Sequence, residues 1–130
     1  MIEIAIAKSN ESLDAAKLLF EKKLYNRSVA SAYFACYQCA LVALHQHKNE
    51  HYSINNARKH NHKSIINAFS RYLIKENNTY SDKIKSYLKE LQEHRHTADY
   101  ELAYSFDKTD AELILNKAIY FCTIVTSKLD

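Results

Sequence analysis

Apolar residues recur along this chain at intervals of three and four, which is the spacing of a helix with one buried face. The pattern predicts five helices in a single succession. They cover about residues 2–23, 26–46, 64–76 and 81–100, with the fifth starting after a break near residue 109.

Polar residues predict where two of these helices begin. Asn26 has the side chain of an N-cap residue and precedes the second apolar run. Thr109-Asp110-Ala111-Glu112 has the spacing of a capping box, in which the hydroxyl and the glutamate satisfy each other's backbone N–H groups. We therefore expect the second and fifth helices to start at these positions.

The second predicted helix has no wide polar face. Such a helix is either central in its bundle or lies in an oligomer interface. Its apolar positions are Val29, Ala30, Ala32, Tyr33, Phe34, Ala35, Tyr37, Ala40, Leu41, Ala43 and Leu44.

Composition supports an all-helical fold. The chain has 130 residues and contains no glycine and no proline. Sheets with tight hairpins usually need glycine at their turns, whereas helices can be connected without it. The length fits one domain with one core. We expect an all-α antiparallel bundle of four to five helices that forms a single domain over residues 1–130.

The charge is mildly basic and permits contact with nucleic acid without demanding it. The formal net charge is +3 with histidine neutral, from 18 basic and 15 acidic side chains. Dedicated duplex binders are usually more basic.

Other features predict a cytoplasmic protein outside the membrane. No segment approaches the length of about 18 apolar residues that spans a bilayer. The first residues carry an acid where a signal peptide carries a base. The three cysteines form no even framework, so we expect reduced thiols.

Histidines gather in residues 45–63, where five of the seven are interleaved with lysine and arginine. This stretch is predicted to be an exposed loop. The histidine pairs of the chain are spaced two residues apart, so they do not share a helix face, and no acid or cysteine stands at a metal-ligand spacing. Surface histidines are the favoured interpretation, and no metal or other cofactor is expected.

Cys36 and Cys39 lie in the middle of the most apolar helix. A redox pair would need a helix N-terminus, and a zinc site would need two further ligands. Burial as small hydrophobic side chains is the expected role.

One charged residue interrupts an apolar stripe near the end of the fourth predicted helix. The stripe is Ile84, Leu88, Leu91, Arg95, Ala98 and Leu102. A guanidinium on a core-facing stripe needs a partner, because burying it unpaired is very costly. Arg95 is therefore the strongest candidate for a functional residue.

Helix geometry leaves two interpretations of Arg95 open. Asp99 lies one turn further along the same face, so the two residues can form a purely structural ion pair. Alternatively, the guanidinium binds a ligand. His96 lies beside Tyr100, whereas Arg95 and Tyr100 are about 140° apart around the axis. They meet one phosphate only if the helix bends or if two subunits contribute.

The chain resembles the HEPN family of small prokaryotic helical domains over most of its length. Several motifs at corresponding places along the chain carry the resemblance. They are Ala15-Ala16-Lys17-Leu18-Leu19-Phe20, Leu24-Tyr25-Asn26, Ser31-Ala32-Tyr33-Phe34-Ala35, His62-Lys63 and Arg95-x-x-Ala98-Asp99-Tyr100.

The resemblance implies a metal-independent ribonuclease that works as a homodimer on RNA. In such enzymes an arginine stabilises phosphate charge and a histidine moves the proton of the attacking 2′-hydroxyl. The resemblance assigns these catalytic positions to Arg95, His96 and Tyr100, with Tyr100 where the family motif ends in histidine. Tyrosine titrates near about pH 10 and histidine near about 6.5, so a tyrosine is a poor general base at neutral pH. His94, Asp99 and Tyr104 are the associated candidates for binding RNA or a nucleotide.

The resemblance also implies a partner. Many HEPN proteins are toxins encoded beside a small nucleotidyltransferase of the MNT type, which in some pairs attaches AMP to a tyrosine near the arginine motif. Tyr100 and Tyr104 are the candidate acceptors here. The alternative function is a non-catalytic HEPN subunit that binds a nucleotide or such a nucleotidyltransferase partner.

Overall fold

The structure is a computed structural model that describes residues 2–47 and 61–129, apart from the side chain of Glu76. These residues form five α-helices, a π-helical segment and no strand, which confirms the predicted all-α bundle. The elements are α1 (Ile2–Glu21), α2 (Tyr25–Gln46), α3 (His62–Phe69), the π-helical continuation η3 (Ser70–Glu76), α4 (Asp82–Tyr100) and α5 (Lys108–Ser127). Most of the predicted histidine-rich loop, including His51 and His60, lies outside the described residues.

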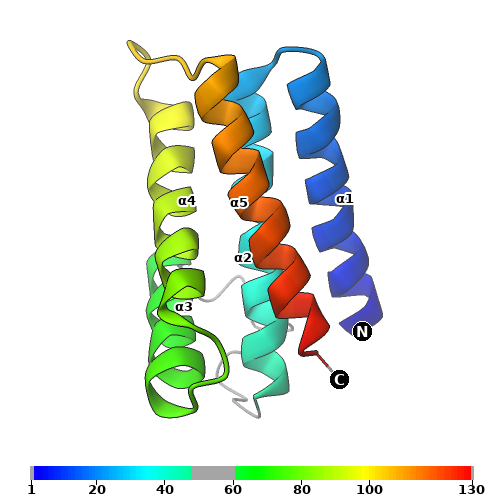
Figure 1. Ribbon diagram of the computed structural model, residues 1–130, viewed down its shortest axis with the longest axis vertical. Coiled ribbons are helices and arrows are strands. Elements are labelled where there is room, and N and C mark those ends of the chain that lie inside the picture. Colours follow the sequence, from blue (N-terminus) through cyan, green and yellow to red (C-terminus); the bar gives the residue numbers. More distant parts are fainter. Residues whose placement is uncertain (1, 48–60, 130) are drawn as a thin grey trace.

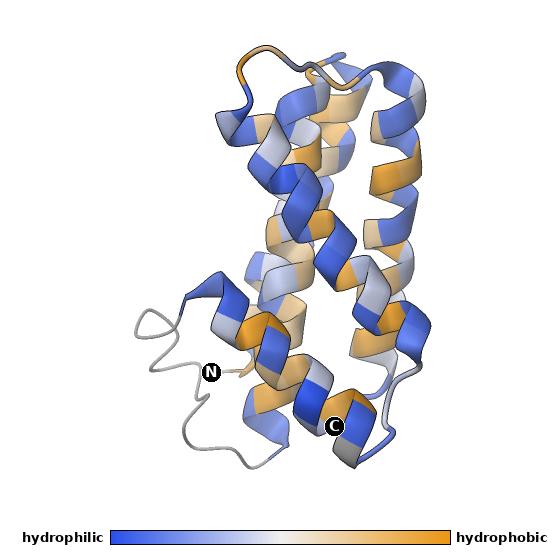
Figure 2. Ribbon diagram, turned by 90° about the vertical axis from the view of Figure 1, so that its left-hand side faces the viewer, coloured by the Kyte–Doolittle hydropathy of each residue, from blue (hydrophilic) through white to orange (hydrophobic). Residues whose placement is uncertain are grey.

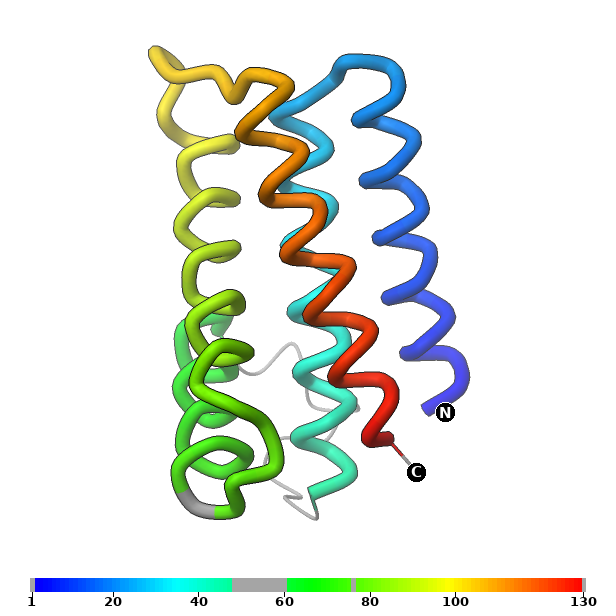
Figure 3. The backbone as a smooth tube through the Cα atoms, in the orientation of Figure 1, coloured from blue at the N-terminus to red at the C-terminus, as the bar shows by residue number. Residues whose placement is uncertain are grey.

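The long helices stand side by side, and sequential neighbours joined by short turns run in opposite directions (Figures 1 and 3). The first turn and the α4–α5 loop lie at one end of the bundle, and both chain ends lie toward the other. α3 and η3 lie beside the lower part of α4, and they run in the opposite direction to it. Because α4 ends near the start of α2, residues far apart in sequence meet at that end.

α2 is the central helix, and it contacts α1, α3, α4 and α5. Its buried residues are spread around its circumference, from Val29 to Leu44. This position within one chain explains the missing polar face, so that face is no longer an argument for a dimer. Hydrophilic and hydrophobic segments alternate along the surrounding helices in Figure 2, as expected for helices with one polar and one apolar face.

The expectation that no segment has the character of a membrane span needs correction for this helix. By length and composition α2 is apolar enough to cross a bilayer, but 72% of its most apolar window is buried inside the bundle. The core helix of a soluble protein has these same properties.

Serine side chains close the contact between α1 and α2. Ser28 Oγ donates to the carbonyl of Ala16 at 2.7 Å, and Ser31 Oγ donates to the carbonyl of Ser12 at 2.7 Å. Ser9 Oγ donates to the carbonyl of Ala35 at 2.9 Å. A buried hydroxyl without a partner would destabilise the fold. Here each serine hydroxyl donates a hydrogen bond to a backbone carbonyl of the other helix. Small side chains thus let the two helices approach closely.

The cysteines are buried, as expected. Sγ of Cys36 lies 3.9 Å from Sγ of Cys122, which joins α2 to α5. Cys39 lies next to Ser9 of α1, with its Sγ 2.8 Å from Oγ. The thiols fill space in the core where α1, α2 and α5 meet.

The structure corrects both predicted capping positions. α2 starts at Tyr25 without a side-chain cap. α5 starts at Lys108 and its N-cap is Asp107, whose carboxylate accepts from the N–H of Asp110 at 2.8 Å. An aspartate caps as well as a threonine does, so the sequence pattern alone placed the start two residues late. The third helix starts at His62, two residues earlier than predicted, with Asn61 as its cap.

Asn26 performs a different task from the one predicted. Its Oδ1 accepts the backbone N–H of Phe106 at 2.9 Å, and its Nδ2 donates to Oγ of Ser105 at 3.1 Å. Phe106 belongs to the core. The start of α2 therefore holds the loop between α4 and α5 in place.

Two left-handed turns form without glycine. Lys23 has φ 63° after α1, and Asn78 has φ 52° after η3. A lysine in this region carries a steric cost that a glycine would not. The tight connection from α1 to α2 is thus made at some expense in conformational energy.

Replacing Asn26 by alanine should destabilise the bundle by about 1–3 kcal/mol, because the part-buried N–H of Phe106 loses its acceptor. Urea unfolding measures the change. Asn26→Asp keeps the acceptor and should cost less. Asn116 is exposed on α5, so Asn116→Ala is the matched control and should not destabilise. Equal effects of Asn26→Ala and Asn116→Ala would contradict the anchoring role.

Candidate functional site

Arg95 lies where the core face of α4 reaches the end of the bundle. Ile84, Leu88 and Leu91 on the same stripe are buried. The side chain of Arg95 keeps 22% of its surface exposed. Leu102, the last predicted member of the stripe, lies beyond the end of α4 and is 93% exposed. The guanidinium therefore lies on the inward face of α4 in its last turns, close to the end of the helix.

Asp99 is shared between two arginines. Its Oδ2 lies 2.8 Å from Nε of Arg95, and its Oδ1 lies 2.7 Å from Nη2 of Arg27. Arg27 Nη2 also donates to the carbonyl of Ala98 at 3.1 Å. The ion pair of Arg95 and Asp99, one of the two interpretations open from sequence, is thus present. Arg27 on α2 was not predicted, because its pairing across two helices leaves no local pattern.

These ion pairs are short but not fully aligned as hydrogen bonds. Neither Nε of Arg95 nor Oδ1 of Asp99 has a hydrogen-bond partner, although both atoms are buried. Buried polar atoms without partners are uncommon in folded proteins and call for an explanation. The short contact with Asp99 is made by Nε of Arg95.

Aromatic rings surround the guanidinium of Arg95. Its Cζ lies 5.2 Å from the ring centre of Phe34 and 5.6 Å from that of Tyr100. Cations over aromatic faces are stabilised by about 0.5–1 kcal/mol at partly exposed sites. Tyr100 is 61% exposed. Arg95 and Tyr100 are therefore in contact within a single subunit, although they are separated around the helix axis. The tyrosine ring makes this contact.

A histidine from α3 completes this surrounding. The ring of His62 stacks on Tyr37 with 4.2 Å between centres, and it lies 5.7 Å from the ring centre of Phe34. Its Nδ1 is 2.6 Å from the hydroxyl of Tyr33. Burial lowers the pKa of His62, and the nearby charge of Arg95 lowers it further. Burial raises the pKa of Tyr33. We call the set Arg27, Phe34, His62, Arg95, Asp99 and Tyr100 the Arg95 cluster.

The sequence contained a signal for His62 that the interpretation as a surface histidine overlooked. His62 precedes the buried Ile65 and Ile66 by three and four residues. At that spacing it shares their helix face. Its partners on α2, Tyr33 and Tyr37, belong to the same apolar run that predicted the central helix.

His96 lies apart from this set of contacts. Its ring is exposed and lies 4.9 Å from that of Tyr100, as the spacing of four residues predicts. It lines an open pocket of about 430 Å³ together with Gln92, Glu93, Thr97 and Glu101. Tyr100 therefore touches both Arg95 and His96.

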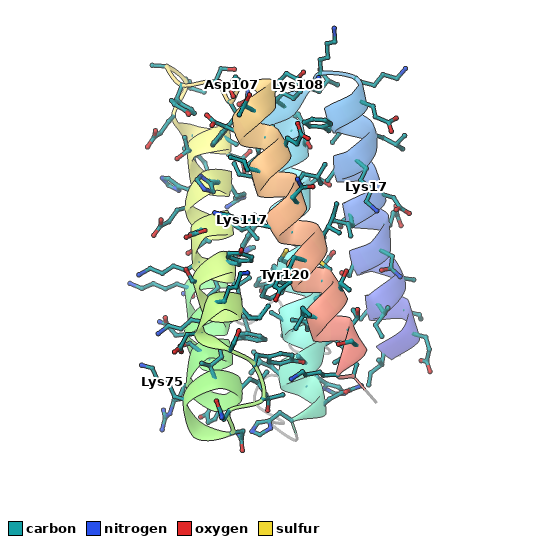
Figure 4. All side chains as sticks on the ribbon, in the orientation of Figure 1. Lys17, Lys75, Asp107, Lys108, Lys117 and Tyr120 are labelled. Carbon is teal, nitrogen blue, oxygen red and sulfur yellow. The ribbon has the colours of Figure 1, made fainter. Side chains whose placement is uncertain are left out.

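His94 and Tyr104 belong to a separate pocket of about 460 Å³ between α4, α5 and their connecting loop. Both rings contact Phe106, with centres 5.8 and 5.0 Å away. The hydroxyl of Tyr104 donates to Asp110 at 3.5 Å. Burial lowers the pKa of His94, and Lys117 adds to the effect. Figure 4 shows Lys117 on the side of α5 that faces α4, where Nζ pairs with Glu90 at 2.8 Å. The predicted site residues thus fall in three neighbouring places: the contacts of Arg95 with Asp99 and Tyr100, the open pocket of His96, and this pocket with His94 and Tyr104.

In the described part of the chain, no three or more histidine, cysteine, aspartate and glutamate side chains are grouped in a way that could hold a metal ion. The chemistry of the Arg95 cluster is instead that of hydrogen-bond donors, one shared carboxylate and aromatic faces. Such a set suits a phosphate group and a stacked base.

The fold and the cluster define a helical domain with an arginine centre near the end of its fourth helix. The family model of the HEPN domain matches residues 2–128. The chain belongs to the HEPN family. It is 31% identical over 128 residues to "Putative toxin MJ0605" of Methanocaldococcus jannaschii, which covers 93% of this chain and 80% of that protein. It is 27% identical over 120 residues to "Putative toxin MJ0142" of the same organism, covering 92% and 76%.

The lowered pKa values of His62 and His94 predict a loss of stability below neutral pH. Unfolded histidines take up protons near about pH 6.5, whereas these two resist protonation in the folded chain, so the unfolded state binds more protons. The free energy of unfolding should therefore fall as the pH drops from about 7.5 through 6.5 to about 5.5.

Urea unfolding at about pH 7.5 and about pH 5.5 measures this dependence. The double variant His62→Gln/His94→Gln should show a shallower decline, while Lys89→Gln on the surface of α4 serves as the control. A decline equally steep in the double variant and in the wild type would show that other groups are responsible.

Proposed function

We propose that this protein is the toxin-type component of a prokaryotic toxin–antitoxin or defence system and acts on RNA as a metal-independent endoribonuclease. The observation that carries the proposal is Arg95, a mostly buried guanidinium that shares the carboxylate of Asp99 with Arg27 and has aromatic neighbours. The toxin names of its relatives support the biological class. The net charge of +3 is compatible with binding RNA through a local patch.

The roles in the reaction follow from the positions on α4. Arg95 binds the phosphate and stabilises the negative charge that grows on it in the transition state. The 2′-hydroxyl attacks phosphorus, and the exposed imidazole of His96 takes its proton. The bond to the 5′-oxygen breaks, and that oxygen takes a proton from solvent, which leaves a 2′,3′-cyclic phosphate and a 5′-hydroxyl group. Tyr100, in contact with both residues, donates a hydrogen bond to the phosphate.

The assembly that we propose is a homodimer whose two Arg95 clusters share one cleft, in the cytoplasm. Its antitoxin would be a nucleotidyltransferase of the MNT type. Tyr100 and Tyr104 are 61% and 46% exposed, so both hydroxyl-bearing rings are accessible to such a partner. An AMP group on Tyr100 would add negative charge and bulk beside Arg95 and block RNA.

Arg95→Ala should reduce RNA cleavage by about 100-fold or more, the loss typical of removing one donor to a transition-state oxyanion. The assay follows a labelled RNA in the presence of EDTA. Lys89→Ala removes one positive charge from an exposed position of α4 and should cleave at the wild-type rate. Cleavage by Arg95→Ala at the rate of Lys89→Ala, or no cleavage by the wild type, would refute the nuclease proposal.

Co-expression with a nucleotidyltransferase encoded beside this gene should add the mass of one AMP group to the intact protein. The tyrosine oxygen attacks the α-phosphorus of ATP, pyrophosphate leaves, and the phenolic proton passes to solvent. Tyr100→Phe should abolish the added mass, whereas Tyr87→Phe, also on α4, should retain it. If the modification persists in Tyr100→Phe and disappears in Tyr104→Phe, the acceptor is Tyr104 in the pocket between α4 and α5.

A further inference from the structure

We infer that His62 binds the phosphate group together with Arg95, as a neutral imidazole whose Nε2–H donates a hydrogen bond, and that Tyr33 is the positioning residue that fixes this tautomer. The inference rests on the proposed function in one respect, namely that a phosphate is the ligand of the Arg95 cluster. It adds a binding residue from α3, outside the motif on α4.

The tautomer follows from the contact between His62 and Tyr33. The side chain of Tyr33 is fully buried, and its hydroxyl lies 2.6 Å from Nδ1 of His62. A buried hydroxyl proton needs an acceptor. Burial also raises the pKa of Tyr33, so the phenol keeps its proton. The phenol therefore donates to Nδ1, and the ring proton of neutral His62 resides on Nε2.

The neighbours of His62 favour the neutral ring. The titratable and charged groups that face it in the described structure are Tyr33 and Tyr37 from α2 and Arg95 from α4. None of them is an anion at neutral pH, and the guanidinium repels a second positive charge. A neutral imidazole in this place donates one hydrogen bond and does not compete with Arg95 for Asp99.

Phe34 links the two donors in space. Its ring centre lies 5.7 Å from that of His62 and 5.2 Å from Cζ of Arg95. Stacking on Tyr37 holds the imidazole plane, and the ion pair with Asp99 holds the Nε edge of Arg95. One charged and one neutral donor thus both lie against the ring of Phe34. Preorganised donors of this kind bind an oxyanion without reorganising.

The inference separates binding from proton transfer. In neutral His62 the ring proton is on Nε2, and the lone pair of Nδ1 accepts the hydrogen bond from Tyr33. The ring therefore has no free lone pair with which to act as a general base. It stabilises the charge of the phosphate, and the proton transfer belongs to another group. RNA phosphodiesters and free nucleotides share the phosphate chemistry, so the experiment includes both.

The tautomer is tested first, without any ligand. The ¹⁵N and ¹H correlations of the imidazole in the wild-type protein should show the proton on Nε2 between about pH 6.5 and 8. Tyr33→Phe should raise the pKa of His62 and mix the tautomers, because the donor to Nδ1 is gone. A proton on Nδ1 in the wild type would overturn the inference.

Binding is tested with a short fluorescein-labelled single-stranded RNA whose 2′-oxygens are methylated, so that no cleavage occurs, and separately with AMP. His62→Phe keeps a ring on Tyr37 but loses the donor, and its affinity should fall about tenfold. His62→Gln keeps an N–H donor and should stay within about threefold of the wild type. His45→Gln, on α2, should have no effect. Tyr33→Phe should bind more tightly as the pH falls below about 6.5, unlike the wild type.

The outcomes distinguish this inference from the proposed function. If His62→Phe binds RNA as the wild type does while Arg95→Gln does not, the inference is wrong and the arginine site stands. If both variants lose affinity but the wild type cleaves no RNA, the phosphate site stands and the nuclease proposal fails. Loss of affinity for AMP alone would assign the site to a free nucleotide. Thermal melts verify that His62→Phe and Tyr33→Phe fold, and His62→Gln provides the test should either unfold.

Discussion

The burial of α2 on all sides is the constraint on which the rest of the structure depends. A helix without a polar face must be covered, and here α1, α3, α4 and α5 cover it. Small residues such as Ala32, Ala35 and Ala40 let these helices approach. Because α2 contacts every other helix, its ends also organise the ends of the bundle. Asn26 and Arg27 at its start hold the loop after α4 and the last turn of α4.

Local pattern was enough for the fold. Apolar spacing of three and four residues located all the helices, because each of them buries a face against α2. Boundaries were less accurate where several polar residues compete for one cap. Asp107 took the place expected for Thr109, and Asn26, suited by type to a cap, bonded across the bundle to Phe106. A side chain of this kind satisfies whichever backbone group tertiary structure brings near, and sequence alone does not state which.

The candidate site could be located from sequence by its central arginine, but its surroundings could not be predicted. A guanidinium on an apolar stripe identified Arg95, and helix spacing identified its pairing with Asp99. Arg27 and Tyr33 come from the central helix and His62 from α3, so their approach to Arg95 depends on helix packing. His94 and Tyr104 are neighbours of Arg95 in sequence, yet the turn of the helix and the following loop carry them to another pocket. These two residues, close to Arg95 in sequence, thus lie away from it in the structure, whereas residues distant in sequence lie beside it.

In the phosphate site that we propose, the sharing of Asp99 between Arg27 and Arg95 determines which phosphates match the charge of the cluster. Two guanidinium cations and one carboxylate leave a single net positive charge. An internal phosphodiester carries one negative charge and matches this balance. A terminal phosphate monoester carries close to two at neutral pH, since its second pKa is about 6, and leaves the carboxylate facing excess negative charge. In the proposed site, the carboxylate that holds the arginines in place would thus also favour the interior of a polynucleotide strand over its end.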